Sequence, residues 1–311
     1  MYHYCRTLVI LKVKYKIIKT NPTFHKRNKH KSGYDLDVLC EKYPDLLPFV
    51  FKNKYETKTI DFANPKAVKA LNTALLFKYY DIKFWEFSDS NLCPPIPGRV
   101  DYIHHLSDLI RKSEIKEDIT ILDVGVGATC IYPILGHAEY DWHFVGTDID
   151  ENSLQFTQKI INENELEAAI SLRHQKDTSQ IFKGILNKND KFAASICNPP
   201  FYKSEAEALE ATTRKLKGLN REVDATVRNF SGTHHELWYN GGEKAFLHNY
   251  LYESSLFKEQ CHWFTTLVSK KDLVKGMYSS LKKLGATDIK TLNMGQGNKI
   301  SRIVAWTFLE K

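Results

Sequence analysis

Residues 119–129 read Ile119-Thr-Ile-Leu-Asp-Val-Gly-Val-Gly-Ala-Thr129, an apolar run that ends in two glycines. A short run of branched apolar residues is typical of a buried strand. Glycines directly after such a run are typical of a tight turn into a helix, because glycine adopts backbone conformations that other residues avoid. The stretch therefore predicts the first strand and turn of an α/β sheet.

The chain beyond this stretch alternates between strand-like and helix-like patterns. Strands are expected at residues 119–124, 142–146, 169–173, 192–197, 263–268, 287–292 and 303–308. Helices are expected at residues 35–42, 66–80, 99–112, 153–162, 242–257 and 270–284. Alternation of this kind predicts an α/β fold with a doubly wound, mostly parallel sheet, in which ligands bind outside the carboxyl ends of the strands.

Positive charge is concentrated near the N-terminus. The chain of 311 residues has a formal net charge of +7, and residues 1–60 contain 13 Lys/Arg against 5 Asp/Glu. The rest of the chain is therefore nearly neutral. A basic N-terminal segment on a neutral body favours a polyanionic partner.

Several classes of protein are disfavoured by composition. The six cysteines are far apart and form no Cys-x-x-Cys pair, so neither a zinc site nor a disulfide framework is expected. No stretch approaches the roughly 18–20 apolar residues of a membrane span. We expect no bound metal, no membrane association and a cytoplasmic location.

The glycine turn at Asp123-Val-Gly-Val-Gly-Ala-Thr129 is a candidate ligand-binding loop. A dinucleotide-binding loop would need a third glycine near position 130, where Cys130 stands. The pattern instead favours a loop for S-adenosylmethionine (AdoMet), and a turn without a ligand is the open alternative. Asp148 ends the second strand and can accept hydrogen bonds from both ribose hydroxyls. It could otherwise cap the next helix, although Asp150 or Asn152 is better placed for that.

The stretch Asn198-Pro-Pro-Phe201 follows the fourth strand and therefore lies at the expected ligand edge. The N6 amine of adenine is a poor nucleophile with two N–H donors, which the side-chain oxygen of Asn198 and the carbonyl of Pro199 can accept. Pro199 and Pro200 would hold that carbonyl in place, and Phe201 offers a flat face for base stacking. The alternative is a simple Asn-Pro turn with a core phenylalanine.

These motifs, in this order, look like those of amino methyltransferases, and further stretches narrow the resemblance. These stretches are His25-Lys-Arg-Asn-Lys-His, Tyr34-Asp-Leu, Ile60-Asp-Phe, Cys93-Pro-Pro-Ile-Pro-Gly-Arg-Val-Asp-Tyr-Ile-His104, Gly127-Ala-Thr-Cys-Ile-Tyr-Pro133, Gly241-Gly-Glu243 and Ala305-Trp-Thr-Phe308. Together they resemble the bacterial RlmF family, the 23S rRNA adenine-1618 N6-methyltransferases, from about residue 21 to the C-terminus.

The resemblance implies a fold and a division of the chain. It implies a class I methyltransferase fold, Rossmann-like, with a seven-stranded sheet that ends in an antiparallel hairpin. It also implies a basic, mainly helical RNA-binding module at residues 21–98 and a methyltransferase domain at residues 99–311. Residues 1–20 match no stretch of the family that we can place, and three readings stay open for this N-terminal extension: a short strand, a disordered tail, or an addition from an upstream start codon.

The resemblance also implies roles for individual residues. The residues expected to bind AdoMet are Arg99, which would hold the cofactor carboxylate, Asp123, Gly125, Gly127, Thr129, Asp148 and Thr178, a loosely aligned adenine contact. The catalytic residues are expected to be Asn198, Pro199, Pro200 and Phe201. The residues expected to bind RNA are His25, Lys26, Arg27, Lys29 and Lys31.

The implied reaction is methylation of the N6 amine of a specific adenine in 23S rRNA, free or in a large-subunit assembly intermediate, by a monomer. A protein glutamine N5-methyltransferase remains an alternative, although tyrosine is typical there at the position of Phe201. DNA adenine methylation and a non-catalytic RNA-binding protein are further alternatives. The long polar segment at residues 203–240 is expected to be mobile near the target base, and His234 and His235 are expected to face solvent or RNA.

Overall fold

The computed structural model describes residues 24–115, 118–204, 206, 207, 210, 237–296 and 299–310. The expected extension at residues 1–20, most of the expected mobile segment, and His234 and His235 lie outside the described residues.

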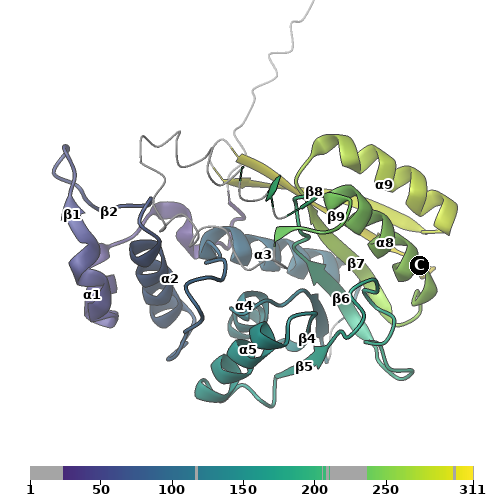
Figure 1. The fold of residues 1–311 in the computed structure, drawn as a ribbon, viewed down its shortest axis with the longest axis horizontal. Coiled ribbons are helices and arrows are strands. Elements are labelled where there is room, and N and C mark those ends of the chain that lie inside the picture. The colour runs from purple at the N-terminus through teal and green to yellow at the C-terminus, as the bar shows by residue number, and fades with distance from the viewer. Residues whose placement is uncertain are drawn as a thin grey trace, which may run out of the picture.

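A seven-stranded mixed sheet forms the centre of the fold (Figure 1). Its strands are β3 (Thr120–Val124), β4 (His143–Asp148), β5 (Ile170–His174), β6 (Phe192–Cys197), β7 (Cys261–Val268), β8 (Asp288–Gln296) and β9 (Lys299–Thr307). Their order across the sheet is β5-β4-β3-β6-β7-β9-β8, and only β9 runs antiparallel to its neighbours, β7 and β8. The predicted α/β class, the seven strands and the terminal hairpin are thereby confirmed.

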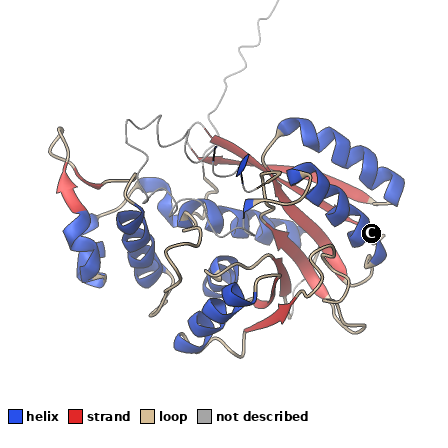
Figure 2. Ribbon diagram, in the orientation of Figure 1, coloured by secondary structure: helices blue, strands red, loops and turns tan. Residues whose placement is uncertain are grey.

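Helices cover both faces of this sheet (Figure 2). One face packs against α3 (Ile96–Lys112), α4 (Ile131–Tyr140) and α5 (Glu151–Glu163), and the other against α8 (Gly242–Leu256) and α9 (Lys271–Leu284). Successive strand residues point to opposite faces, so Ile121 joins the first core and its neighbour Leu122 joins the second. Burial on both faces explains why β6 is buried along its whole length.

The chain reverses its direction of winding at β3. From β3 it passes outward through β4 to β5, then returns to β6 on the other side of β3. The loops that follow β3 and β6 therefore leave the sheet edge in different directions, which opens a crevice at the carboxyl ends of these two strands. The glycine loop (residues 123–129) and the Asn198 segment (residues 198–201) both lie at this crevice.

The N-terminal part is mainly helical and lies at the left of Figure 1. It comprises the 3-10 helices η1 (Lys29–Ser32) and η2 (Pro44–Phe49), the helices α1 (Leu36–Lys42) and α2 (Pro65–Tyr79), and the strands β1 (Val50–Lys52) and β2 (Lys58–Ile60). The hairpin β1–β2 was not expected from the sequence. Helix α3 crosses the expected boundary at residues 98/99, and one core joins α2, α3 and β3. The N-terminal part and the expected methyltransferase domain therefore share a core. The division of the chain at residues 98/99 is a prediction about their separate functions.

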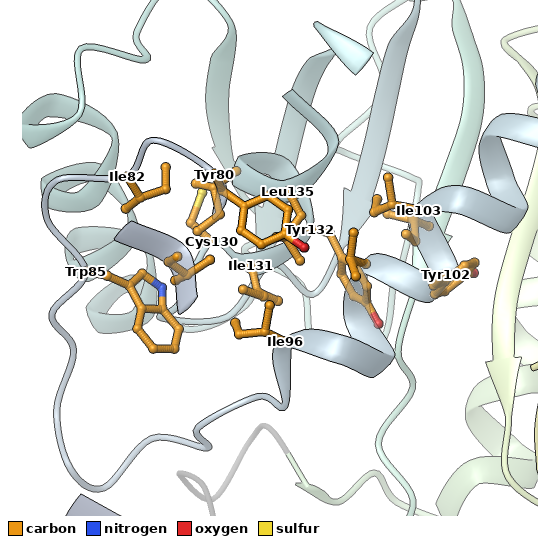
Figure 3. Close-up of a cluster of buried hydrophobic side chains, with 14 of the residues drawn as sticks. Tyr80, Ile82, Trp85, Ile96, Tyr102, Ile103, Cys130, Ile131, Tyr132 and Leu135 are labelled. Atoms are coloured by element: carbon orange, nitrogen blue, oxygen red, sulfur yellow. The ribbon is translucent and has the colours of Figure 1, made fainter. Parts of the chain in front are cut away.

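The segment between α2 and α3, residues 81–95, is called here the connecting segment. Figure 3 shows its residues Ile82 and Trp85 beside Cys130 and Ile131 at the start of α4. The indole N–H of Trp85 donates to the carbonyl of Thr129 at 2.8 Å. The connecting segment therefore ties the N-terminal part to the loop that follows β3.

No helix among the described residues is both long and apolar enough to cross a membrane.

Candidate active site

A cavity opens at the carboxyl ends of β3, β4 and β6. Eight of the predicted site residues line it, namely Arg99, Gly125, Gly127, Thr129, Asp148, Thr178, Asn198 and Pro200. Of the residues predicted to bind AdoMet or to be catalytic, three do not line it, namely Asp123, Pro199 and Phe201. Residues that are far apart in the sequence are thus brought to one cavity at the edge of the sheet where ligands were expected.

The glycine loop is held tightly against β4. Gly125 and Gly127 have φ angles of 78° and 64°, which other residues rarely adopt. The backbone N–H groups of Gly125 and Val126 both donate to the carbonyl of Thr147 at 2.9 Å. The N–H of Gly127 donates to Asp148 Oδ2 at 2.9 Å. Since these donors already have partners within the protein, the loop does not form a cradle for a pyrophosphate.

The loop ends at Cys130, which is buried and has a φ of 52°. A left-handed conformation is uncommon for a residue other than glycine and persists where the surroundings hold it. Here the preceding carbonyl, that of Thr129, is held by Trp85, and helix α4 begins at the next residue. The position of a third glycine in a dinucleotide loop is therefore filled by a buried cysteine that ends the turn.

Asp148 and Asp150 are the acidic residues that line the cavity, and Asp148 is the one predicted to bind the ribose. Its Oδ1 accepts from the N–H of Asp150 and its Oδ2 from the N–H of Gly127, both at 2.9 Å. Each oxygen retains a second lone pair for a ligand hydroxyl. Asp150, as predicted, caps α5 by accepting from the N–H groups of Asn152 and Ser153. Burial raises the pKa of Asp148, against the effect of the two backbone donors.

Two side chains at or next to the cavity have buried polar atoms that find no hydrogen-bond partner in the described part of the chain. Both carboxylate oxygens of Asp123 are buried without a hydrogen bond, and so is Nε of Arg99, whose Nη1 donates to the hydroxyl of Tyr132 at 2.9 Å. Burial, reinforced by the negative charge of Asp148, raises the pKa of Asp123 well above its usual value, and Arg99 opposes this. An acid and a guanidinium with unused hydrogen-bonding capacity fit the zwitterionic amino-acid group of AdoMet. The residues present therefore fit this cofactor.

The Asn198 segment continues from β6 and is fixed at its far end. Asn198 and Pro200 line the cavity, and Pro199 is buried between them. The backbone N–H groups of Phe201 and Tyr202 both donate to the carbonyl of Leu237 at 3.0 Å. The side chain of Phe201 is partly exposed beside the cavity, so base stacking on Phe201 stays a prediction.

Further residues of the cavity were missed by sequence reasoning. They are apolar or aromatic for the most part and include Leu92, Pro94, Tyr132, Trp238, Tyr239 and Phe246. Trp238 and Tyr239 directly precede the Gly241-Gly-Glu243 stretch, and Tyr132 lies in the Gly127–Pro133 stretch. Two of the stretches that carry the family resemblance could therefore have pointed to Tyr132, Trp238 and Tyr239 as residues of the cavity.

The basic cluster expected to bind RNA packs in part against the helices. His25 and Arg27 contact the carboxylate of Asp108 at 3.2 Å and 2.7 Å, and Lys29 pairs with Glu139 at 2.8 Å. Lys26 and Lys31 are exposed. Burial lowers the pKa of His25, which favours its neutral form. Contact with RNA by Lys26 and Lys31 would break no ion pair among the residues that the structure describes, whereas Arg27 and Lys29 would have to share their charge with an acid.

No group of three His, Cys, Asp or Glu side chains within the described part of the chain is arranged to hold a metal ion.

The sheet order, the glycine loop, the carboxylate at the end of β4 and the Asn-Pro-Pro-Phe segment at the end of β6 together define a class I methyltransferase that uses AdoMet. Comparison with known proteins gives the family. Residues 18–310 match the model of an RNA methyltransferase family, and the chain belongs to that family.

Curated relatives and solved structures agree with this assignment. The chain is 49% identical to the ribosomal RNA large subunit methyltransferase F of Flavobacterium psychrophilum over 306 residues, which covers 96% of this chain and 98% of that protein. It is 48% identical to the protein of the same name from Bacteroides thetaiotaomicron, over 92% of this chain and 98% of that one. The resemblance to the RlmF family is confirmed.

Among solved structures, the catalytic domain of human METTL16 in complex with hairpin 6 of the MAT2A 3′UTR superposes with a TM-score of 0.77. The identity is 27%, and the match covers 93% of this chain and 98% of that one. The N-terminal domain of human METTL16 in complex with SAH matches with a TM-score of 0.74 at 25% identity, over 93% of this chain and 100% of that one.

Proposed function

We propose that this protein methylates the N6 amine of a specific adenine in 23S rRNA, at the position modified by the adenine-1618 enzymes that it resembles. The observation that carries the proposal is the placement of Asn198 and Pro200 on the same cavity as the glycine loop and Asp148. The names of the curated relatives support large-subunit rRNA as the substrate. We expect the protein to act as a monomer in the cytoplasm, on free rRNA or on an assembling large subunit.

AdoMet, when bound, supplies an electrophilic methyl group. Asp148 would accept hydrogen bonds from the ribose hydroxyls with the lone pairs that its two backbone donors leave unused. Arg99, oriented by its hydrogen bond to Tyr132, would hold the carboxylate of the amino-acid group. Asp123 would provide a negative charge near the cationic groups when it is ionised.

The chemistry expected of the Asn198 segment is mainly positioning. Oδ1 of Asn198 and the carbonyl of Pro199 would each accept one N–H of the adenine amine, which turns the nitrogen lone pair toward the methyl group. The backbone donors of Phe201 and Tyr202 fix the end of the segment on Leu237, so its carbonyls stay in place. No strong base is required, because the nitrogen becomes a cation before it releases its proton.

A methyl-transfer assay tests the proposed function. Wild-type protein incubated with labelled AdoMet and unmodified 23S rRNA should produce N6-methyladenosine, identified by mass spectrometry of the nucleosides. Asn198→Ala removes one of the two acceptors, and we expect about a 100-fold or greater loss of rate with unchanged AdoMet affinity.

The control for this assay is Asn187→Ala, a change of the same kind in the turn before β6, which should leave the rate unchanged. Label in protein instead of RNA, or full activity in Asn198→Ala, would contradict the proposal.

A further inference from the structure

Exposed lysines gather on helix α9, which lies at the right of Figure 1, far from the N-terminal part. They are Lys270, Lys271, Lys275, Lys282 and Lys283, and Asp272 is the one acidic residue in the helix. A row of lysines on an outer helix is usually only a solvated face. Their position relative to the cavity distinguishes two groups among them.

The first group, Lys270, Lys271 and Lys275, lies at the start of α9. Strand β7 ends at Val268 and α9 begins at Lys271, so this group lies at the carboxyl edge of the sheet, where the cavity opens. Lys271 and Lys275 are four residues apart and therefore lie on the same side of the helix. The second group, Lys282 and Lys283, is in the last turn, about 16 Å farther along the helix axis.

The pairing of β6 with β7 indicates where the first group lies relative to the Asn198 segment. Strands β6 and β7 are parallel neighbours in which Phe192 pairs with Cys261 and Ala194 with Trp263. The same offset sets Thr266 level with Cys197, the last residue of β6, so Ser269 and Lys270 follow a few residues later at the same edge of the sheet. Neighbouring strands are only about 4.8 Å apart, so the turn that follows β7 lies at the same edge of the sheet as the segment that follows β6.

The turn that carries these lysines is held in place by α8. Glu243, in the first turn of α8, accepts from the N–H of Ser269 at 2.7 Å and also from its hydroxyl. Trp238 and Tyr239, which precede α8, line the cavity. One hydrogen-bonded corner therefore joins the cavity wall to the residue before Lys270.

We propose that Lys270, Lys271 and Lys275 form a second RNA-binding surface, which holds backbone phosphates next to the target adenine. The inference rests on the proposed function and adds a contact surface on the side of the cavity opposite the N-terminal part. The three ammonium groups have no acidic partner among the described residues. The positive end of the α9 helix dipole adds to their attraction for phosphate.

Contacts of this kind give affinity and position, while sequence choice comes from elsewhere. A flipped adenine must be held against the tendency of its strand to stack, and phosphates anchored on both sides of the cavity would do so. The surface should therefore strengthen RNA binding without any effect on AdoMet binding.

Two matched variants test the inference. Lys270→Gln with Lys271→Gln changes the group at the cavity, and Lys282→Gln with Lys283→Gln makes the same change at the other end of the same helix. The affinity of each for unmodified 23S rRNA is measured over a range of salt concentrations. We expect the first variant to bind about 10-fold more weakly at low salt, and its slope of log affinity against log salt to fall by about 1.4–1.8 for two lost contacts. The second variant should bind like the wild type.

Equal RNA affinity and equal salt slopes in the two variants would overturn the proposal. A drop in AdoMet affinity or in melting temperature confined to the first variant would also overturn it, because the lysines would then serve folding. The assay for N6-methyladenosine with wild-type protein decides on the proposed function separately, so a failure of either idea can be told from a failure of the other.

Discussion

At the scale of single residues, Asp148 fixes the glycine loop with the same carboxylate that we propose for the ribose hydroxyls. Its hydrogen bonds to the N–H groups of Gly127 and Asp150 fix the glycine loop to the end of β4. A carboxylate has about four acceptor positions, so two remain for a diol. An amide would have to turn its NH2 group toward one of the two backbone donors, and this asymmetry leads to a direct test.

Asp148→Asn should weaken AdoMet binding by about 10- to 100-fold, since hydrogen bonds to a charged group contribute about 1.5–3 kcal/mol. Because burial raises the pKa of Asp148, acidification should weaken wild-type binding at a higher pH than an ordinary aspartate would give, and the variant should lose this dependence. Isothermal titration calorimetry at several pH values measures both effects.

Asp35→Asn is the matched control, because Asp35 caps α1, does not line the cavity, and asparagine caps a helix as well as aspartate does. Equal loss of AdoMet affinity in both variants would contradict the role assigned to Asp148.

At the scale of elements, the connecting segment links the two parts of the protein. Asn164, at the end of α5, accepts from the N–H groups of Lys83 and Phe84 and donates to the carbonyl of Phe84. Trp85 then reaches the carbonyl of Thr129, and Leu92 and Pro94 line the cavity. The geometry of the glycine loop thus depends on a segment that precedes the sheet.

Trp85→Phe keeps the ring but removes the N–H donor, so the carbonyl of Thr129 is left unpaired in the interior. We expect a loss of about 1–3 kcal/mol in the free energy of unfolding. We also expect weaker AdoMet binding, because Thr129 lines the cavity. Urea unfolding and calorimetry with AdoMet measure the two effects.

Trp263→Phe is the control for this change. Trp263 is equally buried and donates to Ser113 at 2.7 Å, far along the chain from the glycine loop. The Trp263→Phe variant should lose stability but keep its AdoMet affinity. If the two variants bound AdoMet alike, the connecting segment would have no special role in the loop.

Elements with a strong pattern could be predicted from the sequence, and elements made by long-range contact could not. All seven strands of the sheet were expected, most clearly where burial on both faces leaves an apolar run such as residues 192–197. The hairpin β1–β2 escaped notice, since its strands have three residues each and are mostly exposed. The presence of Cys130 in place of a third glycine already argued against a dinucleotide-binding loop. Only the folded structure shows that Cys130 has a left-handed backbone and that Trp85 holds the preceding carbonyl.

The residues of the candidate site likewise fall into those that the sequence indicates and those that long-range contacts bring to the cavity. Residues within motifs, such as Asp148 and Asn198, could be expected at the ligand edge because they stand at strand ends, and both line the cavity. Trp238 and Tyr239 reach the cavity through the backbone pairing of Tyr202 with residues 237–239, which no local pattern announces. The partners of Arg27 and Lys29 are likewise distant in sequence, so the charge run alone suggested free cations.

At the scale of the whole molecule, the N-terminal segment docks on α3 through a cluster of buried polar groups. Asp101 accepts from the N–H of His25 and from the side chain of Asn28, and His104 contacts the hydroxyl of Tyr140 at 2.7 Å. Burial lowers the pKa of His104 to about 4, and burial likewise lowers that of His30 to about 4. Both imidazoles are therefore neutral in the folded protein at neutral pH.

This cluster predicts how stability depends on pH. The pKa of each imidazole is lower in the folded state than the usual value of 6.5, so the unfolded state binds protons first as the pH falls. Stability should therefore be fully present above about pH 6.5 and fall progressively toward pH 4. His104→Gln removes one titrating group, and its free energy of unfolding in urea should decline less steeply over this window than that of the wild type.

His248→Gln, at an exposed position on α8, is the control and should follow the wild-type curve. Identical slopes for all three proteins would show that His104 is not held neutral by burial, and the docking of the N-terminal segment would then be insensitive to acid in this range.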